Sequence, residues 1–270
     1  MREDEPNDDE GPAVAGETSA ERISSGSLSA QTRVGEKALL ISPIPGLFLS
    51  AIVTLLVWGA LEVMPPVFEL PEHLRELSGN APEAQQKERM EASLAASNRN
   101  AAVSLGLLAS ALGLFLTIAE VKFRRQGLRA IWAGPLAILI AGVFAVGGGV
   151  LGGMLTASSV LPEDPLARTI LVQGTMFGLV GLGVGSGVGL AVTLPTFRPR
   201  LLATCFAGGM LGGLLAGLVF PFAASVLLPI ARTEVLMPDP GVSRLLWLAL
   251  ASSAIVLPLT GMGKEAETGK

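Results

Sequence analysis

The sequence contains a single histidine, His73, a single cysteine, Cys205, and no tyrosine. One cysteine excludes a disulfide within the chain and a metal site built from several of its own thiolates. One histidine excludes a histidine-rich metal site and the HExxH helix of metalloproteases. We therefore expect no metal ion and no cofactor, and we interpret Cys205 as a small apolar residue packed inside a helix.

Charged residues are also scarce, at 16% of the chain, and they are unevenly distributed. Eight acidic residues fall within the first 21 positions, whereas the short segments between the apolar runs are basic. No basic patch typical of nucleic-acid binding is present, so we expect no nucleic-acid partner. The centres of the apolar runs hold no ionisable residue. This argues against a coupled transporter or a proton pump, which keeps such groups at the middle of the membrane.

Apolar residues and glycine dominate the rest of the sequence. Apolar residues make up 50% of the chain, and 33 of the 270 residues are glycine, which is typical of a membrane protein. Six apolar runs approach the roughly 20 residues that a helix needs to cross a bilayer. The predicted fold is therefore all-α, a polytopic membrane bundle of about six transmembrane helices. The predicted spans are 45–64, 101–121, 130–155, 174–194, 201–221 and 244–262.

Two polar tails flank the predicted membrane domain, which covers 41–262. Residues 1–40 combine acids, serine, glycine and proline with few large apolar groups. Such a segment cannot bury enough apolar surface to offset the entropy lost on ordering, which predicts a disordered acidic tail. Residues 263–270 form a short polar tail at the other end of the chain.

A polar segment, 65–100, separates the first two spans. Pro65 and Pro66 end the first span, because proline cannot continue a helix. From Glu83 onward the sequence has no helix-breaking residue, so we expect a polar helix that runs directly into the span 101–121.

Basic residues in the short loops set the predicted topology. One cluster lies between the second and third spans, and a second lies between the fourth and fifth spans. Short basic loops stay in the cytoplasm. Six spans then place both termini in the cytoplasm and 65–100 outside, in a multi-pass protein of the cell membrane. The topology-setting residues are Lys122, Arg124, Arg125, Arg129, Arg198 and Arg200.

The glycine-rich run 174–194 is the most distinctive stretch of the chain. Gly181, Gly185 and Gly189 recur every four residues and share one helix face, beside a second row of glycines at 183 and 187. Faces without side chains let another helix approach closely in a membrane. We therefore expect this helix at the centre of the bundle. The predicted helix-packing residues are Gly149, Gly153, Gly181, Gly185, Gly189, Gly209, Gly213 and Gly217.

Few polar or amphipathic side chains remain in the spans. We expect most of the polar ones to bond backbone carbonyls of their own helices. They are Gln173, Thr175, Ser186, Thr204 and Ser225. The tryptophans fall toward span ends, and we interpret them as anchors at the membrane surface. They are Trp58, Trp132 and Trp247. Glu120 lies at a span end, four residues before Arg124, and we expect these two to pair. Pro221 should kink or end the fifth span.

Two sequence patterns leave alternatives open or are rejected. FRRQGLRA at Phe123 resembles FRPRLLAT at Phe197, and further matches follow at offsets of 74 to 76. This pattern is compatible with a duplicated helical hairpin and with chance in a sequence of low variety. A GxGxxG pattern also occurs at Gly147, Gly149 and Gly152, but the apolar run continues through it and no acidic residue follows at the expected distance. We do not interpret it as a dinucleotide site.

Three classes of function are open to such a chain. We expect a non-enzymatic integral membrane protein that serves as a scaffold or as a subunit of a membrane assembly. Its partners would be the lipid bilayer and either another membrane protein or further copies of the chain. The alternative is a passive pore for a small neutral solute, because glycine faces expose carbonyl groups to a lumen. An enzyme would need its few titratable groups to converge at the outer surface. These groups are His73, Glu69, Glu72 and Asp164.

Overall fold

The computed structural model describes residues 43–77, 81–123, 130–158, 161–194, 198–227, 236–238 and 241–261. The predicted tails at 1–40 and 263–270 lie outside this part of the chain. The described residues form seven helices and no strand. The helices are α2 (Pro43–Val63), α3 (Glu72–Arg75), α4 (Glu83–Phe123), α5 (Ala130–Thr156), α6 (Pro165–Thr193), α7 (Pro199–Leu227) and α8 (Gly241–Gly261).

Six of these helices, all except α3, are long and apolar enough to cross a membrane. The chain is therefore an all-α, multi-pass membrane protein, as the apolar runs predict. α2, α5 and α8 begin and end within three residues of the predicted spans. α4 runs without interruption from the polar segment into the second span, because nothing in its sequence breaks the helix.

α6 begins nine residues before the predicted span, at Pro165. Asp164 caps the helix, since its Oδ2 accepts a hydrogen bond of 2.7 Å from the Ala167 N–H. Pro165 occupies the first turn, where its missing N–H has no helical partner to lose. A hydropathy pattern does not predict this helix start, because the first turns contain the charged residue Arg168. In the structure Arg168 donates a hydrogen bond to the Thr156 carbonyl oxygen.

α7 continues past Pro221 to Leu227, so of the two expected effects of this proline, a kink or an end, the end does not occur and the kink stays a prediction. Pro221 is buried among other helices. In a membrane bundle, neighbouring helices and local adjustment compensate for the lost backbone hydrogen bond, and proline is tolerated inside a spanning helix.

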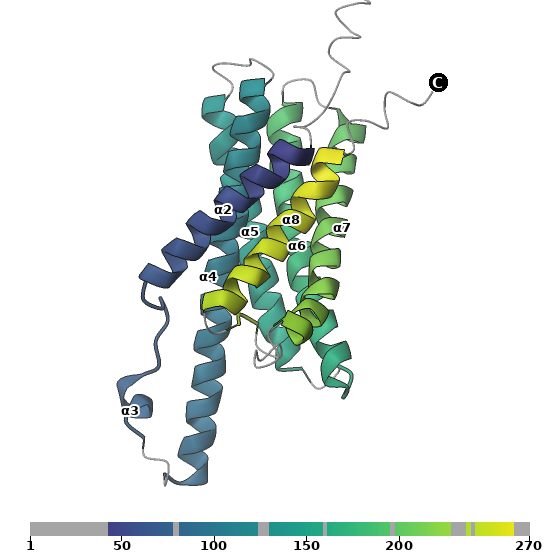
Figure 1. The fold of residues 1–270 in the computed structure, drawn as a ribbon. Helices are drawn as coiled ribbons and strands as arrows, with labels where there is room; N and C mark the ends of the chain where they lie inside the picture. Colours follow the sequence, from purple (N-terminus) through teal and green to yellow (C-terminus); the bar gives the residue numbers. More distant parts are fainter. Residues whose placement is uncertain are drawn as a thin grey trace, which may run out of the picture. The chain divides into compact units, whose positions relative to one another are not determined.

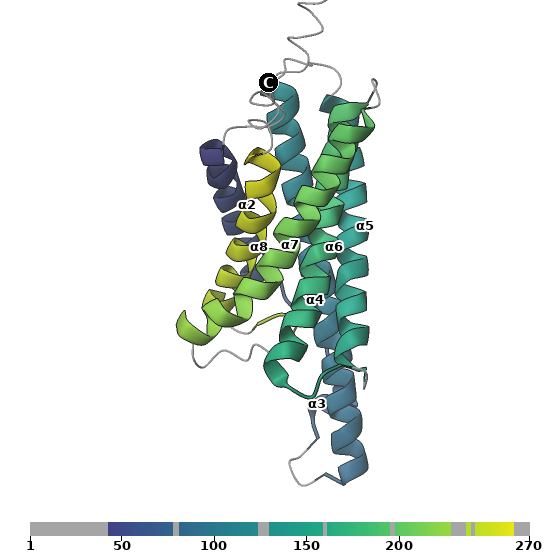
Figure 2. The same cartoon turned by 90° about the vertical axis from the view of Figure 1, so that its right-hand side faces the viewer.

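Four of the long helices, α4 to α7, pack against one another in chain order, and α2 pairs with α8 (Figures 1 and 2). The α2–α8 pair crosses the other helices obliquely (Figure 1). α6 contacts α4, α5, α7 and α8. In its most apolar window 83% of the residues are buried, against at most 56% in any other span. This confirms the prediction that the glycine-rich helix lies at the centre.

The first glycine row of α6 lies against α7. A Cβ atom added at Gly181 or Gly185 would come within 3.0 Å of the carbonyl oxygen of Gly209 or Cys205, closer than real Cβ atoms approach. Gly189 lies against Leu202 and Cys205, which also belong to α7. The relation is reciprocal. Added Cβ atoms at Gly209, Gly213 and Gly217 would overlap the backbone of α6. Two backbones therefore meet directly along this interface.

The second glycine row of α6 lies against α5. A Cβ added at Gly183 would lie 2.6 Å from the Phe144 Cβ, and one added at Gly187 would lie 2.9 Å from the Ala137 carbonyl oxygen. Two glycines of α5 face α4 in turn: an added Cβ at Gly149 would overlap the backbone of Ala102, and one at Gly153 would lie 3.0 Å from the Asn98 side chain. Both rows of α6 thus pack against helices of the same chain.

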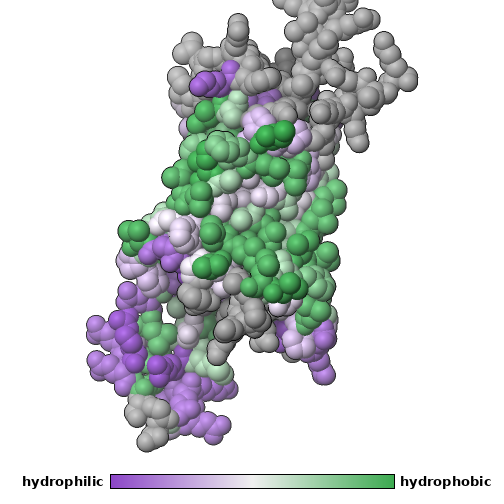
Figure 3. All heavy atoms as spheres, viewed as in Figure 1, coloured by the Kyte–Doolittle hydropathy of each residue, from purple (hydrophilic) through white to green (hydrophobic). Residues whose placement is uncertain are grey.

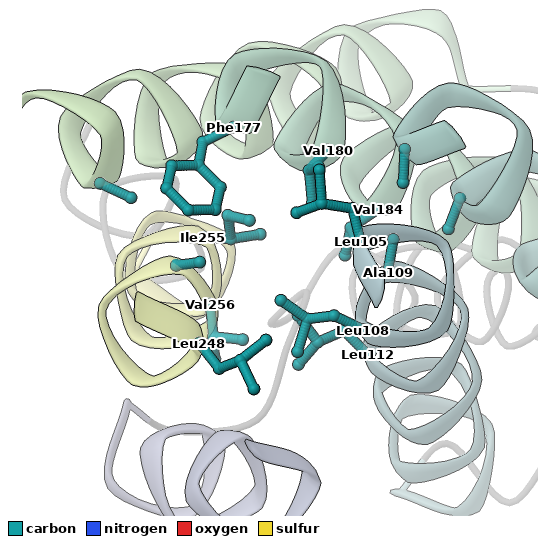
Figure 4. Packing of buried hydrophobic residues seen from close by; sticks show 14 of the residues in the cluster. Leu105, Leu108, Ala109, Leu112, Phe177, Val180, Val184, Leu248, Ile255 and Val256 are labelled. Carbon is teal, nitrogen blue, oxygen red and sulfur yellow. The ribbon is translucent and has the colours of Figure 1, made fainter. Parts of the chain in front are cut away.

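Large apolar side chains fill the side of α6 that faces α4 and α8 (Figure 4). Phe177, Val180 and Val184 of α6 point toward the leucines of α4 and toward Leu248, Ile255 and Val256 of α8 (Figure 4). Trp247 of α8 packs on Phe177, with ring centroids 5.1 Å apart.

Trp247 is fully buried, so its interpretation as a membrane-surface anchor is wrong. It comes within two turns of the start of α8, but α8 leans against α6 and this turn lies inside the bundle. Trp132 is exposed, and Trp58 is half-buried and donates from its Nε1 to the Gly241 carbonyl oxygen at 2.8 Å.

The surface divides by polarity. Hydrophobic side chains cover much of the visible middle of the bundle, and hydrophilic side chains gather around α3 and the first half of α4 (Figure 3). Exposed apolar residues on α5 and α7, such as Leu139, Val143 and Leu215, are of the kind that faces lipid in a membrane protein.

We predict that Gly185→Ala destabilises the bundle whereas Gly147→Ala does not. Each substitution gains about 1 kcal/mol of helix propensity. Only the first forces a Cβ against a backbone carbonyl, since nothing lies within 4 Å of a Cβ added at Gly147. Overpacking typically costs about 1–3 kcal/mol. Thermal unfolding in detergent should show a lower midpoint for Gly185→Ala alone, and equal midpoints would contradict the packing described above.

Candidate functional site

A cavity lies at the end of the bundle from which α4 projects, and we call it the α4 cleft. Its volume is about 590 Å³, within the range of roughly 300–1,000 Å³ that small-molecule sites occupy. One wall is α4, and another is residues 64–70, which follow α2. The rest of the lining comes from Leu61 at the end of α2, Arg75 of α3, Met237, and Arg244 at the start of α8.

Asn100 fixes residues 64–70 to α4. Its Oδ1 accepts from the Phe68 N–H and its Nδ2 donates to the Phe68 carbonyl oxygen, both at 2.9 Å. The Arg99 guanidinium lies over the Phe68 ring, 5.6 Å from its centroid. A primary amide can satisfy both backbone groups of one residue, so a single side chain sets the width of the cleft at this point.

Charges of both signs line or border the cleft. Arg75 Nη2 lies 2.5 Å from Glu69 Oε2, and both side chains are about half exposed. Arg244 Nη1 lies 3.1 Å from Glu62 Oε1, with the side chains 13% and 36% exposed. Each arginine therefore has a carboxylate beside it, and the second pair also joins the end of α2 to the start of α8.

Polar contacts join α2 to α8 at several positions along the two helices, and this helix pair forms one side of the cleft. Thr54 and Ser252 share a hydrogen bond of 2.6 Å between their hydroxyl oxygens, and both residues are buried. The Trp58 bond to Gly241 and the Glu62–Arg244 pair follow toward the cleft. Pairs of this kind act as specific links between helices where lipid leaves no hydrophobic drive for association.

A second polar cluster lies inside the bundle. Gln173 of α6 accepts from Trp247 Nε1 at 3.1 Å and donates from its Nε2 to the Leu236 carbonyl oxygen at 3.3 Å. The tendency of polar side chains to bond their own helix does not describe these two bonds of Gln173, because its longer side chain reaches α8 and the segment before it. Beside this cluster lies a smaller cavity of about 230 Å³, lined by Glu163 and Arg168 among others.

Three of the four shorter polar side chains of the spans bond their own helices, as predicted. Thr175, Thr204 and Ser225 each donate at 2.8 Å to a carbonyl oxygen three or four residues earlier in their own helix. The buried Ser186 hydroxyl has no hydrogen-bond partner among the described residues. Glu120 is buried, and its expected partner Arg124 lies outside the described part of the chain.

The four residues of the enzyme hypothesis have separate structural partners. Glu69 pairs with Arg75, and His73 Nε2 lies 3.9 Å from Glu88 Oε1 on α4. Asp164 caps α6, and Glu72 accepts the Glu76 N–H at its backbone carbonyl. Among the described residues, no group of three or more histidine, cysteine or acidic residues is placed to hold a metal ion.

The structure agrees with the interpretation of the GxGxxG pattern and of the single cysteine. Gly147, Gly149 and Gly152 all lie inside α5, so the strand and turn that a dinucleotide site requires do not occur there. Cys205 is buried on α7 beside Gly185 and Gly189, in agreement with its interpretation as a packed residue. The duplicated hairpin stays a prediction.

The described topology-setting residues lie at the end of the bundle opposite the α4 cleft. Lys122 is exposed in the last turn of α4, and Arg198 and Arg200 are exposed at the start of α7. The end of α4 and the start of α7 lie at the same end of the bundle (Figure 1). Three more of these residues lie outside the described part of the chain. They are Arg124, Arg125 and Arg129.

No protein-family model, curated protein or solved structure matches this chain. The functional interpretation therefore depends on the geometry alone. Sequence reasoning missed the α4 cleft, because Asn100, Phe68 and Arg244 are far apart in the chain and belong to no motif. The signal in the sequence was the polar and charged composition of 65–100, in which Phe68 is the single aromatic residue.

We predict that Asn100→Ala loosens residues 64–70. The substitution removes two hydrogen bonds, each worth about 1 kcal/mol at most at an exposed site. Limited proteolysis of the purified protein should cut this segment several-fold faster. Gln85→Ala on the same helix is the control, because Gln85 is exposed and lies away from the cleft. Equal cleavage rates for the two variants would contradict the role given to Asn100.

We also predict that Gln173→Leu is more destabilising than Thr175→Val. The first variant buries Trp247 Nε1 without its acceptor, which costs about 1–3 kcal/mol. The second removes a hydroxyl that bonds only its own helix. Thermal unfolding in detergent should show the larger fall in midpoint for Gln173→Leu. A Thr175→Val midpoint as low or lower would show that the α6–α8 link contributes nothing.

Proposed function

We propose that this protein is a non-enzymatic scaffold or subunit of a membrane assembly, and that the projecting half of α4 binds the partner. The observation that carries the proposal is the exposure of this half. From Glu83 to Ala95 every residue is exposed except Ala92, which is half-buried. A helix that is solvated nearly all round is typical of an element that bridges to something else.

The projecting half of α4 offers one feature that a partner can bury. Met90 and Leu94 are 62% and 46% exposed and lie one turn apart on the same face. Lys87 and Glu91 flank them and form an ion pair at 4.0 Å. An apolar centre with a charged rim is the usual composition of a protein–protein contact. The partner is either another membrane protein or a second copy of this chain.

The proposed location is the cell membrane, with both termini in the cytoplasm. Lys122, Arg198 and Arg200 support this orientation, because basic residues are retained on the cytoplasmic side and these lie at one end of the bundle. The projecting half of α4 then lies outside the cell.

The alternative, a passive pore for a small neutral solute, has less support. A pore built from the glycine-rich helix would expose its bare faces to water. Both glycine rows of α6 instead lie against α5 and α7, at distances that leave no room for a side chain.

We predict that Met90→Glu combined with Leu94→Glu dissociates the assembly without unfolding the protein. In the complex, the two new carboxylates would lose their hydration at an apolar contact, which costs binding free energy. In the isolated chain both positions are exposed, so the carboxylates stay hydrated and the fold is unaffected. The measurement is native gel electrophoresis of the full chain in mild detergent, with two differently tagged copies to recognise self-association. Gln85→Glu is the control, since it adds charge on the opposite face of the same helix.

Two outcomes contradict the proposal. In the first, the wild-type chain migrates as a monomer in every mild detergent. In the second, Gln85→Glu dissociates the complex as fully as the double variant does.

A further inference from the structure

The wall that α4 contributes to the cleft changes polarity along its length. The lining residues Ser93, Ser97 and Asn100 are followed at helical spacing by Val103 and Leu107. At a rise of about 1.5 Å per residue this wall is roughly 21 Å long, with a polar and an apolar half of about 10 Å each. Ser104 also lies on the wall, but its hydroxyl donates to the Asn100 carbonyl oxygen at 2.9 Å.

The apolar half of the wall belongs to the spanning part of α4. Leu107 is 39% exposed and lines the cleft together with Leu61 of α2. Leu61 is half-buried and lies on α2, whose exposed residues before Glu62 are apolar, such as Leu55 and Leu56. The cleft therefore continues into the surface that faces hydrocarbon, and an occupant can have its apolar part in the bilayer.

Three charged residues, Glu69, Arg75 and Arg244, line the cleft from elements other than α4. Arg75 and Glu69 lie on the segment after α2, and Arg244 lies at the start of α8 with Glu62 beside it. Arginine at the end of a spanning helix is placed at the depth of lipid phosphates, where its planar donors suit phosphate oxygens. The carboxylates of Glu69 and Glu62 disfavour a purely anionic group but are favourable to an ammonium group.

We propose that the α4 cleft is a binding site for one zwitterionic phospholipid. Its phosphate lies toward Arg244 and Arg75, its ammonium group lies toward Glu69, and the upper part of one acyl chain follows Val103 and Leu107. The rest of the lipid stays in the bilayer, which is why a cavity of about 590 Å³ is sufficient. The polarity of α4, the continuity with the lipid-facing surface and the charge balance all agree with this occupant. The site is separate from the partner contact at Met90 and Leu94.

The test is native mass spectrometry of the full chain, reconstituted with an equimolar mixture of phosphatidylethanolamine and phosphatidylglycerol and then delipidated stepwise. The wild-type chain should retain one molecule of phosphatidylethanolamine after the remaining lipid has gone. Val103→Trp fills the apolar half of the cleft and should reduce this retention at least ten-fold. Val143→Trp is the matched control, because Val143 lines a shallow apolar groove on α5 away from the cleft.

Thermal unfolding midpoints should be measured for both variants. If Val103→Trp does not fold, Ser97→Trp fills the polar half of the same cavity and should show the same loss. Retention of no lipid by the wild-type chain, equal loss in the cleft variant and in Val143→Trp, or a preference for phosphatidylglycerol would each overturn the proposal. The partner test with Met90 and Leu94 is independent, so failure of one proposal leaves the other standing.

Discussion

The structure depends on the direct approach of backbones around α6. Gly181 and Gly185 meet carbonyl oxygens of α7, and Gly183 and Gly187 meet α5. In lipid the apolar side chains have no preference for one another over the acyl chains, so helices associate through close packing and polar links. A helix that presents bare faces to two neighbours gains the most from such packing, which is why α6 is the most buried span.

The arrangement around α6 determines where polar groups can be placed. The side of α6 between the two glycine rows carries large residues, and there Gln173 links α6 to Trp247 of α8. α8 in turn contacts α2 through the Thr54–Ser252 hydrogen bond and the Glu62–Arg244 ion pair. The α4 cleft exists because α2 ends at its two prolines while α4 continues beyond it, so residues 64–70 fold back onto a helix wall that no span covers.

Several features of the fold were predictable because they depend on local composition. Six apolar runs imply six spanning helices, and the uninterrupted sequence after Glu83 implies one long helix. Hydroxyls at Thr175 and Thr204 bond their own helices because a short side chain reaches no further. The start of α6 and the continuation of α7 past Pro221 were missed, since a cap geometry and the compensation by neighbouring helices are not visible in hydropathy.

Composition and helix periodicity are enough to specify the class of this protein: an all-α membrane chain with bare glycine faces on one helix. This follows because an unsatisfied backbone in lipid costs several kcal/mol, so an apolar run has almost no conformation open to it except a helix. Only the tertiary structure decided what those faces meet, that Trp247 is buried, and that Asn100, Phe68 and Arg244 border one cavity. These outcomes depend on contacts between residues distant in the chain, and helix periodicity says which residues share a face but not which helix lies opposite.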